Sequence, residues 1–128
     1  MRAADLMAKA VQAVASARLL LNSGDADGAC NRAYYAMFDA ARAALLSSGH
    51  EVGRTHKGVL IAFSDRLVKA GRLPKETGRL LKQAEARRYV ADYEAEPVQL
   101  GDADDSVAQA ETFVTTIQGV FLPAQPMP

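Results

Sequence analysis

The sequence predicts an all-α protein, an antiparallel helical bundle of four to five helices, and three observations lead to this prediction. Apolar residues recur at the i, i+3, i+4, i+7 spacing of amphipathic helices. No run shows the β-branched alternation of a half-buried strand. Breaks near residues 24–25, 47–55, 71–74 and 97–104 separate the runs by short links, and such links favour antiparallel neighbours.

Five helices are expected in chain order. The first spans about residues 2–22, and the second follows Gly24-Asp25 and ends near Ser48-Gly49. The third spans about 56–70, with Gly71 as its stop. The fourth opens at Pro74, a residue suited to a first helical turn, and continues to about Ala95. The fifth spans about 102–121.

An apolar stripe supports each of these helices. The inward residues are expected to be Leu6, Ala10, Val14, Ala17 and Leu21 in the first; Cys30, Ala33, Tyr34, Met37, Phe38, Ala41, Ala44 and Leu45 in the second; Leu60, Phe63, Leu67 and Ala70 in the third; Leu80, Leu81, Ala84, Ala91 and Ala95 in the fourth; and Val107, Ala110, Phe113, Val114 and Ile117 in the fifth. We therefore expect residues 1–122 to form a single helical bundle. Three prolines in the last six residues predict a flexible tail over 123–128.

Composition limits the classes of function. The chain has 15 basic and 15 acidic residues, and this zero net charge argues against constitutive coating of DNA, which needs a basic surplus. The single cysteine, Cys30, cannot form an internal disulfide and fits a reducing cytosol. No apolar run approaches the roughly 18 residues that span a bilayer. A cytoplasmic protein without a membrane segment is the expectation.

One permanent charge falls on an inner stripe. On a helical wheel Arg88 lies between the angular positions of Leu81 and Ala84, and Asp92 follows one turn later at the edge of the apolar face. An unpaired buried charge is costly, so this end of the helix opens to a cleft, is covered by a partner subunit, or is neutralised by Asp92.

Two interpretations of Arg88 and Asp92 remain open on spacing alone. In the structural one they form an intrahelical ion pair with a snorkelling arginine. In the functional one Arg88 forms an anion site, because a guanidinium is planar, always charged and able to bind phosphate through two N–H groups.

Three segments resemble the HEPN domain, in its compact stand-alone branch. They are NRAYYAMFDAARAALL at 31–46, THKGVLIAF at 55–63 and RRYVADYE at 87–94, within a resemblance that covers about residues 4–118. The resemblance implies a dimeric antiparallel bundle of four to five helices. It also implies a toxin–antitoxin-like setting, in which many such proteins are ribonucleases and act with a small nucleotidyltransferase encoded next door.

The family's ribonuclease motif is incomplete here. The motif joins an arginine, a polar residue directly after it, and a histidine separated from the arginine by four to six residues. Arg88 matches the arginine, but Tyr89 follows it, and positions 93–95 read Tyr93, Glu94 and Ala95. RNA cleavage needs a base, an acid and a cation at the phosphate, and Arg88 supplies only the cation. Asp92 is a candidate base.

The expected function is therefore a HEPN-type component of a two-protein module, with a nucleotide- or RNA-phosphate-binding centre at Arg88 and Asp92. The alternatives are a metal-independent endoribonuclease that uses Arg88 and Asp92 with His56, and a non-catalytic dimer that binds nucleotide, RNA or protein. A homodimer is expected because alanine-rich helices with exposed aromatic positions need covering.

Five further residues are candidates for binding or partner contact, and they are Tyr93, Asn31, Tyr35, His56 and Lys57. The family pattern suggests a hydrogen bond between Arg88, as the donor, and Asn31. Tyr93 is a flanking group for partner contact or modification. His56 and Lys57 start the third helix, where a helix N-terminus and cations suit an anion, although exposed basic residues at a helix start are the plainer interpretation. His50 and His56 lack companion ligands, so neither a metal nor a cofactor is expected.

Overall fold

The computed structural model describes residues 2–122, and this part of the chain is entirely helical and contains no strand. The predicted all-α class is confirmed. The elements are α1 (Ala3–Asn22), α2 (Ala26–Ser47), α3 (His56–Phe63), the π-helical segment η1 (Ser64–Val68), α4 (Lys75–Tyr93) and α5 (Leu100–Phe121).

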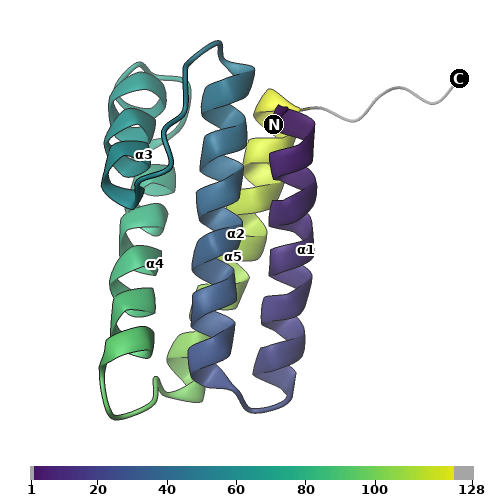
Figure 1. The fold of residues 1–128 in the computed structure, drawn as a ribbon, viewed down its shortest axis with the longest axis vertical. Helices are drawn as coiled ribbons and strands as arrows, with labels where there is room; N and C mark the ends of the chain where they lie inside the picture. Colours follow the sequence, from purple (N-terminus) through teal and green to yellow (C-terminus); the bar gives the residue numbers. More distant parts are fainter. Residues whose placement is uncertain (1, 123–128) are drawn as a thin grey trace, which may run out of the picture.

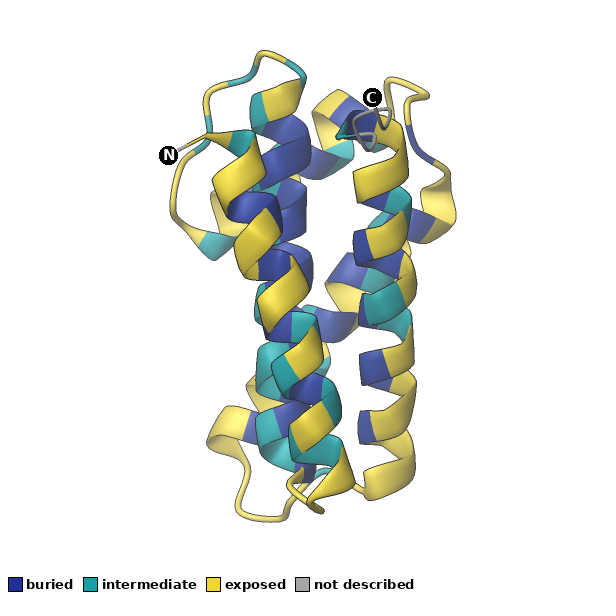
Figure 2. Ribbon diagram, turned by 90° about the vertical axis from the view of Figure 1, so that its right-hand side faces the viewer, coloured by how far each residue is buried: buried dark blue, intermediate teal, exposed yellow. Residues whose placement is uncertain are grey.

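Helix α2 is the central element of the bundle. It packs against α1, α4 and α5, and α3 lies beside its C-terminal half, above α4 (Figure 1). In Figure 1, α1 and α4 stand on opposite sides of α2, and α5 runs behind it. Buried residues line the inner faces of all these helices (Figure 2).

The sequence of α2 explains its central position. Most of its buried residues are alanines, including Ala29, Ala36 and Ala40, which let neighbouring helices approach closely. The large apolar side chains that the core also needs come partly from other helices, such as Phe63 and Phe113, whose ring centroids are 5.6 Å apart. One narrow face of α2 remains half-buried, and it consists of Arg32, Tyr35, Asp39, Arg42 and Leu46.

The link from α2 to α3 determines where along α2 the helix α3 begins. Gly49 has a φ of 84°, a left-handed conformation that glycine adopts without strain. The chain then turns back and descends along α2 before α3 starts (Figure 1). The Thr55 hydroxyl caps α3 by accepting a hydrogen bond from the Gly58 backbone N–H at 3.1 Å. The first residue of α3, His56, is therefore held beside the middle of α2.

Several predicted details were wrong at the helix ends. The α-helix of the third element stops at Phe63, and the wider π turn of η1 follows it. Ala70 is exposed, because it lies beyond η1 in the turn that Gly71 closes. Helix α4 ends at Tyr93, so Ala95 falls in the following loop and is also exposed. Helix α5 begins two residues earlier than predicted, at Leu100.

The first helix is rotated slightly from its predicted orientation. Met7 and Ala13 are buried, whereas Val14 and Leu21 are only half-buried. The side chain of Arg18 reaches α5, where its Nη1 donates to Asp104 Oδ1 at 3.1 Å, and this contact helps fix that orientation. In residues 2–122 no helix is both long enough and apolar enough to cross a membrane. The predicted tail over 123–128 lies outside the described residues.

Candidate functional site

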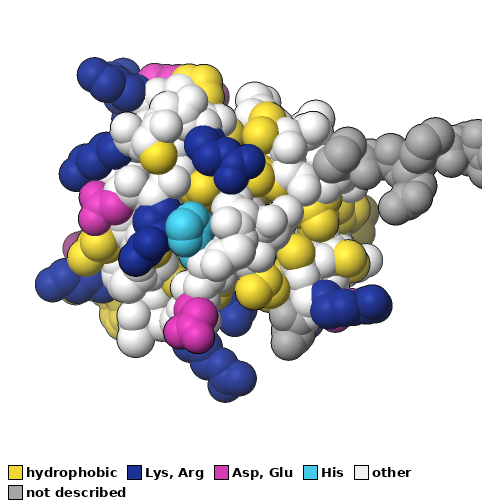
Figure 3. Space-filling model, turned by 90° about the horizontal axis from the view of Figure 1, so that it is seen from above, with side chains coloured by type: hydrophobic (Ala, Val, Ile, Leu, Met, Phe, Trp, Pro, Cys, Tyr) yellow, Lys and Arg dark blue, Asp and Glu magenta, His cyan; other side chains and the backbone are white. Residues whose placement is uncertain are grey.

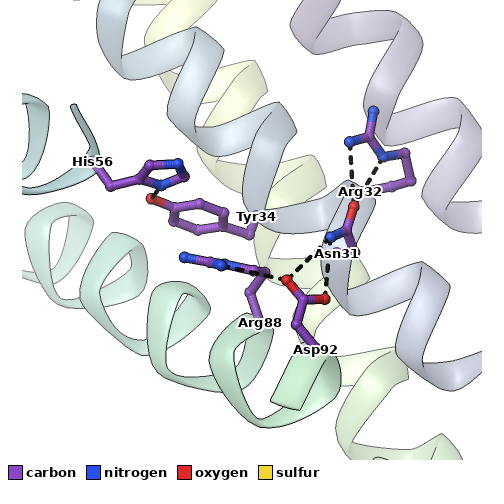
Figure 4. Close-up of polar contacts among 6 residues, drawn as sticks. All are labelled: Asn31, Arg32, Tyr34, His56, Arg88 and Asp92. Atoms are coloured by element: carbon purple, nitrogen blue, oxygen red, sulfur yellow. Dashed lines mark hydrogen bonds and ion pairs between the residues drawn. The ribbon is translucent and has the colours of Figure 1, made fainter. Parts of the chain in front are cut away.

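Arg88 lies on the buried side of α4, facing α2. Its side chain is 13% exposed, and its guanidinium carbon lies 5.0 Å from the centroid of the Tyr34 ring (Figure 4). Its Nη1 donates to Asp92 Oδ2 at 3.3 Å, one helical turn further along α4. The aromatic face and the carboxylate together hold the cation at a partly desolvated position.

Two features make this arginine unusual. Its Nε is buried and has no hydrogen-bond partner among the described residues. Burial acts to lower the pKa of Arg88, but the hydrogen bond to Asp92 and the nearby Tyr35 and Tyr34 outweigh it, and the pKa is raised. The guanidinium therefore stays charged in a place where part of its hydrogen-bonding capacity is unused.

Asn31 approaches Asp92 and not Arg88, which corrects the expected contact. Its Nδ2 donates to Asp92 Oδ1 at 3.2 Å, and its Oδ1 accepts from Arg32 Nε at 3.3 Å and from Arg32 Nη2 at 3.2 Å. The Asp92 carboxylate thus joins α2 to α4 (Figure 4). An acceptor-only carboxylate suits this position, because both groups that face it, the Asn31 amide and the Arg88 guanidinium, are donors.

His56 reaches the same cluster from α3. Its Nδ1 lies 2.7 Å from the Tyr34 hydroxyl oxygen, and its ring stacks on Phe38 with centroids 4.7 Å apart. Burial, with a further contribution from Glu85, raises the pKa of Tyr34. The Tyr34 hydroxyl accordingly keeps its proton, and a hydrogen bond joins its oxygen to His56 Nδ1.

These five residues form what we call the polar centre, and they are Arg88, Asp92, Asn31, Tyr34 and His56 (Figure 4). The pair formed by Tyr34 and His56 was not predicted from the sequence. The available signal was that a buried tyrosine hydroxyl needs a partner, and that a histidine at a helix start is a candidate.

The other candidate residues lie around this centre or away from it. Tyr35 is half-buried, with the Arg32 guanidinium 5.2 Å from its ring centroid and the His56 ring 5.6 Å away. Tyr93 is 67% exposed and packs against Tyr89 on the outer face of α4, with centroids 4.8 Å apart. Lys57 is exposed. In the described part of the chain, no three His, Cys, Asp or Glu side chains gather as a metal site would require.

Comparison with known proteins identifies the family. The model of the HEPN domain matches residues 3–120. The chain belongs to the HEPN domain family. A relative from Gloeobacter violaceus, named UPF0332 protein glr0978, is 42% identical over 89 residues, which are 70% of each chain. A relative from Methanocaldococcus jannaschii, named "Putative toxin MJ0605", is 30% identical over 105 residues, covering 82% of this chain and 78% of the relative.

A solved structure shows the same HEPN fold. The crystal structure of TT1696 from Thermus thermophilus matches with a TM-score of 0.76 at 21% identity, and the match covers 92% of this chain and 97% of that one. At this identity the likeness concerns the arrangement of helices alone.

Proposed function

We propose that this HEPN protein is one component of a toxin–antitoxin-like two-protein module and that its polar centre binds the phosphate of a nucleotide or RNA. The toxin-like relatives support the setting. The partner is a small nucleotidyltransferase, as the family resemblance implies. A homodimer is part of the same proposal, and the exposed aromatic pair of Tyr89 and Tyr93 supports a contact surface on α4.

The observation that carries the phosphate site is the incomplete bonding of Arg88. Its single hydrogen bond within residues 2–122 goes to Asp92, although a guanidinium offers a fork of N–H donors. A purely structural buried arginine is expected to satisfy more of its donors, because each unsatisfied one costs about 1–3 kcal/mol. A phosphate that accepts two parallel hydrogen bonds fits the remaining capacity.

Asp92 and Asn31 have a positioning role in this proposal. Asp92 holds one edge of the guanidinium, and Asn31 holds Asp92 from α2. The cation is thereby fixed before an anion arrives, which lowers the entropy cost of binding. Loss of Asn31 should weaken the site through Asp92 without removing the charge.

A binding measurement with matched variants tests the site. Fluorescence anisotropy with a labelled single-stranded RNA compares the wild type with Arg88→Ala and with Arg79→Ala. Arg79 is an exposed arginine of the same helix, paired with Glu76 at 3.3 Å, so it controls for lost charge. We expect Arg88→Ala to lose binding and Arg79→Ala to retain it. Equal binding by all three proteins would refute the phosphate site.

The module is tested separately. The neighbouring gene, if it encodes a small nucleotidyltransferase, is co-expressed with a tagged copy of this chain, and the purified mass is measured. A stable complex of the two proteins is expected. Cells that express this chain alone are expected to grow poorly, and co-expression of the partner is expected to restore their growth. A chain that is harmless in cells and purifies alone beside such a partner would refute the module.

His56 favours a second candidate function, that of a metal-independent endoribonuclease. In that reaction a base removes the proton of the 2′-hydroxyl, the oxygen attacks phosphorus, and an acid protonates the leaving 5′-oxygen. The His56 imidazole is a candidate for the proton transfers, and Arg88 suits the negative phosphate. Cleavage of a mixed labelled RNA pool in EDTA, lost in both Arg88→Ala and His56→Gln, would establish this function. No cleavage would leave binding as the activity.

A further inference from the structure

A second arginine, Arg42 of α2, has an environment like that of Arg88: its guanidinium lies over Phe38, which follows Tyr34 by one turn of α2. The Arg88 guanidinium carbon is 5.0 Å from the Tyr34 ring centroid, and that of Arg42 is 5.9 Å from the Phe38 ring centroid. The two rings are themselves 5.9 Å apart. Within residues 2–122, the buried side-chain nitrogens and oxygens without a hydrogen-bond partner are Arg42 Nε and Arg88 Nε alone.

Arg42 is less well bonded than the other half-buried arginines. Those four each donate at least one hydrogen bond, and they are Arg18, Arg32, Arg87 and Arg88. Arg42 donates none in the part of the chain described, and Asp39 Oδ1, at 3.8 Å from its Nη1, lies beyond hydrogen-bond distance. Its side chain is nevertheless only 20% exposed. Its Nε is closed to solvent, so an external acceptor would bind the Nη groups of this guanidinium.

The acid beside Arg42 is also incompletely compensated. Burial raises the pKa of Asp39, and the nearby charges of Arg42, Lys9 and Arg32 oppose that rise without cancelling it. Three cations therefore surround one partly desolvated carboxylate. These three cations outnumber the one carboxylate, although the chain as a whole is neutral.

A hollow of about 730 Å³ opens at Arg42, between the start of α1, the end of α2 and the segment before α3. Its lining residues are Leu6, Arg42, Leu46, Glu51, Val52 and Arg54. The end of the bundle seen from above carries both basic and acidic side chains, with one histidine among them (Figure 3). The hollow offers two guanidinium groups against the one carboxylate of Glu51, together with an apolar wall, so it can receive a phosphate and the sugar or base attached to it.

His56 lies between the two arginines. Its ring centroid is 4.7 Å from that of Phe38, on which Arg42 leans, and 5.4 Å from that of Tyr34, on which Arg88 leans. Cations and aromatic rings thus succeed one another along α2. Tyr34 and Phe38 are buried, at 0% and 6% exposed, so the half-buried His56 is the ring of this series that a base can reach. Single-stranded nucleic acids are bound where cations follow the phosphates and an accessible ring supports a base.

We propose that Arg42, together with Arg54, is a second phosphate subsite, and that the protein takes a single-stranded oligonucleotide whose backbone passes His56 between Arg88 and Arg42. This inference rests on the proposed phosphate site at Arg88. It narrows the ligand from any nucleotide to a strand with at least two phosphates.

A length series tests the second subsite. The ligands are a fluorescently labelled mononucleotide and a labelled hexanucleotide. They are compared on the wild type, Arg42→Gln, Arg88→Gln and a control, Arg66→Gln. Arg66 is an exposed arginine of η1. We expect Arg42→Gln to weaken hexanucleotide binding by roughly tenfold or more, as loss of a hydrogen-bonded charge does. Its affinity for the mononucleotide should not change. The slope of log K against log salt for the hexanucleotide should fall by about 0.7, the share of one phosphate on a single strand.

The outcomes separate the two proposals. If Arg88→Gln loses binding while Arg42→Gln binds the hexanucleotide as the wild type does, the second subsite is wrong and the first stands. If the wild type binds neither ligand, both are wrong. If Arg42→Gln does not fold, as judged by its thermal melt, Arg54→Gln tests the same subsite from its exposed rim and should weaken only the hexanucleotide. An unchanged hexanucleotide affinity in that variant would then overturn the inference.

Discussion

Replacing Arg88 with leucine distinguishes a functional arginine from a structural one. The substitution removes the charge and the hydrogen bond to Asp92, and it places an apolar side chain against the Tyr34 ring. A residue that serves ligand binding is expected to leave the free energy of unfolding unchanged or to lower it. A structural ion pair is expected to raise it.

The contacts in the structure set the expected magnitude. The Asp92 pair is partly solvated, with side chains 13% and 30% exposed, so its loss costs about 0.5–1 kcal/mol. The cation–π contact with Tyr34 contributes about another 1 kcal/mol. Removal of the buried, unpartnered Nε recovers about 1–3 kcal/mol, and Asp92 keeps its hydrogen bond from Asn31. The free energy of unfolding should therefore change by less than about 1 kcal/mol or increase.

Urea denaturation followed by circular dichroism measures this change, with the m-value as a check that both proteins unfold in one transition. Arg79→Leu, at an exposed site of the same helix, gives the background effect of the substitution. A destabilisation by Arg88→Leu of more than about 2 kcal/mol would show that the pair with Asp92 holds the helix in place. The reasoning from its unused donors would then be refuted.

Three other predictions concern the frame around the site. Asp25→Ala removes the cap on the Gly28 N–H at 2.8 Å and should lower the free energy of unfolding by about 1 kcal/mol; an unchanged urea midpoint would contradict this. Because the pKa of Tyr34 is raised in the folded state, its stabilising contribution is complete below its unfolded pKa of about 10 and is lost as pH rises further. Between neutral and strongly alkaline pH, the Tm of Tyr34→Phe should therefore fall less than the Tm of the wild type. Equal falls in the two proteins would contradict this role of Tyr34. Burial raises the pKa of the Cys30 thiol, so Ellman's reagent should modify it only as fast as the bundle opens; immediate reaction of the native protein would exclude this burial.

The helices themselves could be predicted because periodicity is a local property of the chain. The stripe of α2 from Cys30 to Leu45 is buried as predicted. Helix ends were less predictable. The spacing of Phe63 and Leu67 continues an α-helical pattern, and nothing in it indicates the π turn that the packing of η1 imposes. Ala95 likewise fits the period of α4 but lies beyond its last turn.

The polar centre was only partly predictable for a different reason. Arg88 and Asp92 belong to one helix, so their spacing places them together. The contacts of Asn31 with Asp92 and of Tyr34 with His56 join residues from different helices. Such contacts depend on how α2 is rotated against α4 and on the path of the loop before α3, and helical period fixes neither. The sequence did not indicate Arg42 as a candidate site residue, because unused hydrogen-bonding capacity is visible only in three dimensions.

The attachment of α3 has a consequence for motion. This helix has eight residues and buries only Val59 and Phe63, whereas α2 is buried along most of its length. Segments with few buried contacts open at a lower free energy than the whole fold. We expect the amides of α3 to exchange with deuterium by local opening while those of α2 exchange only on global unfolding. His56 would then separate from Tyr34 and return many times within the lifetime of one folded molecule. The space between Arg88 and Arg42 would open and close at the rate of this local unfolding.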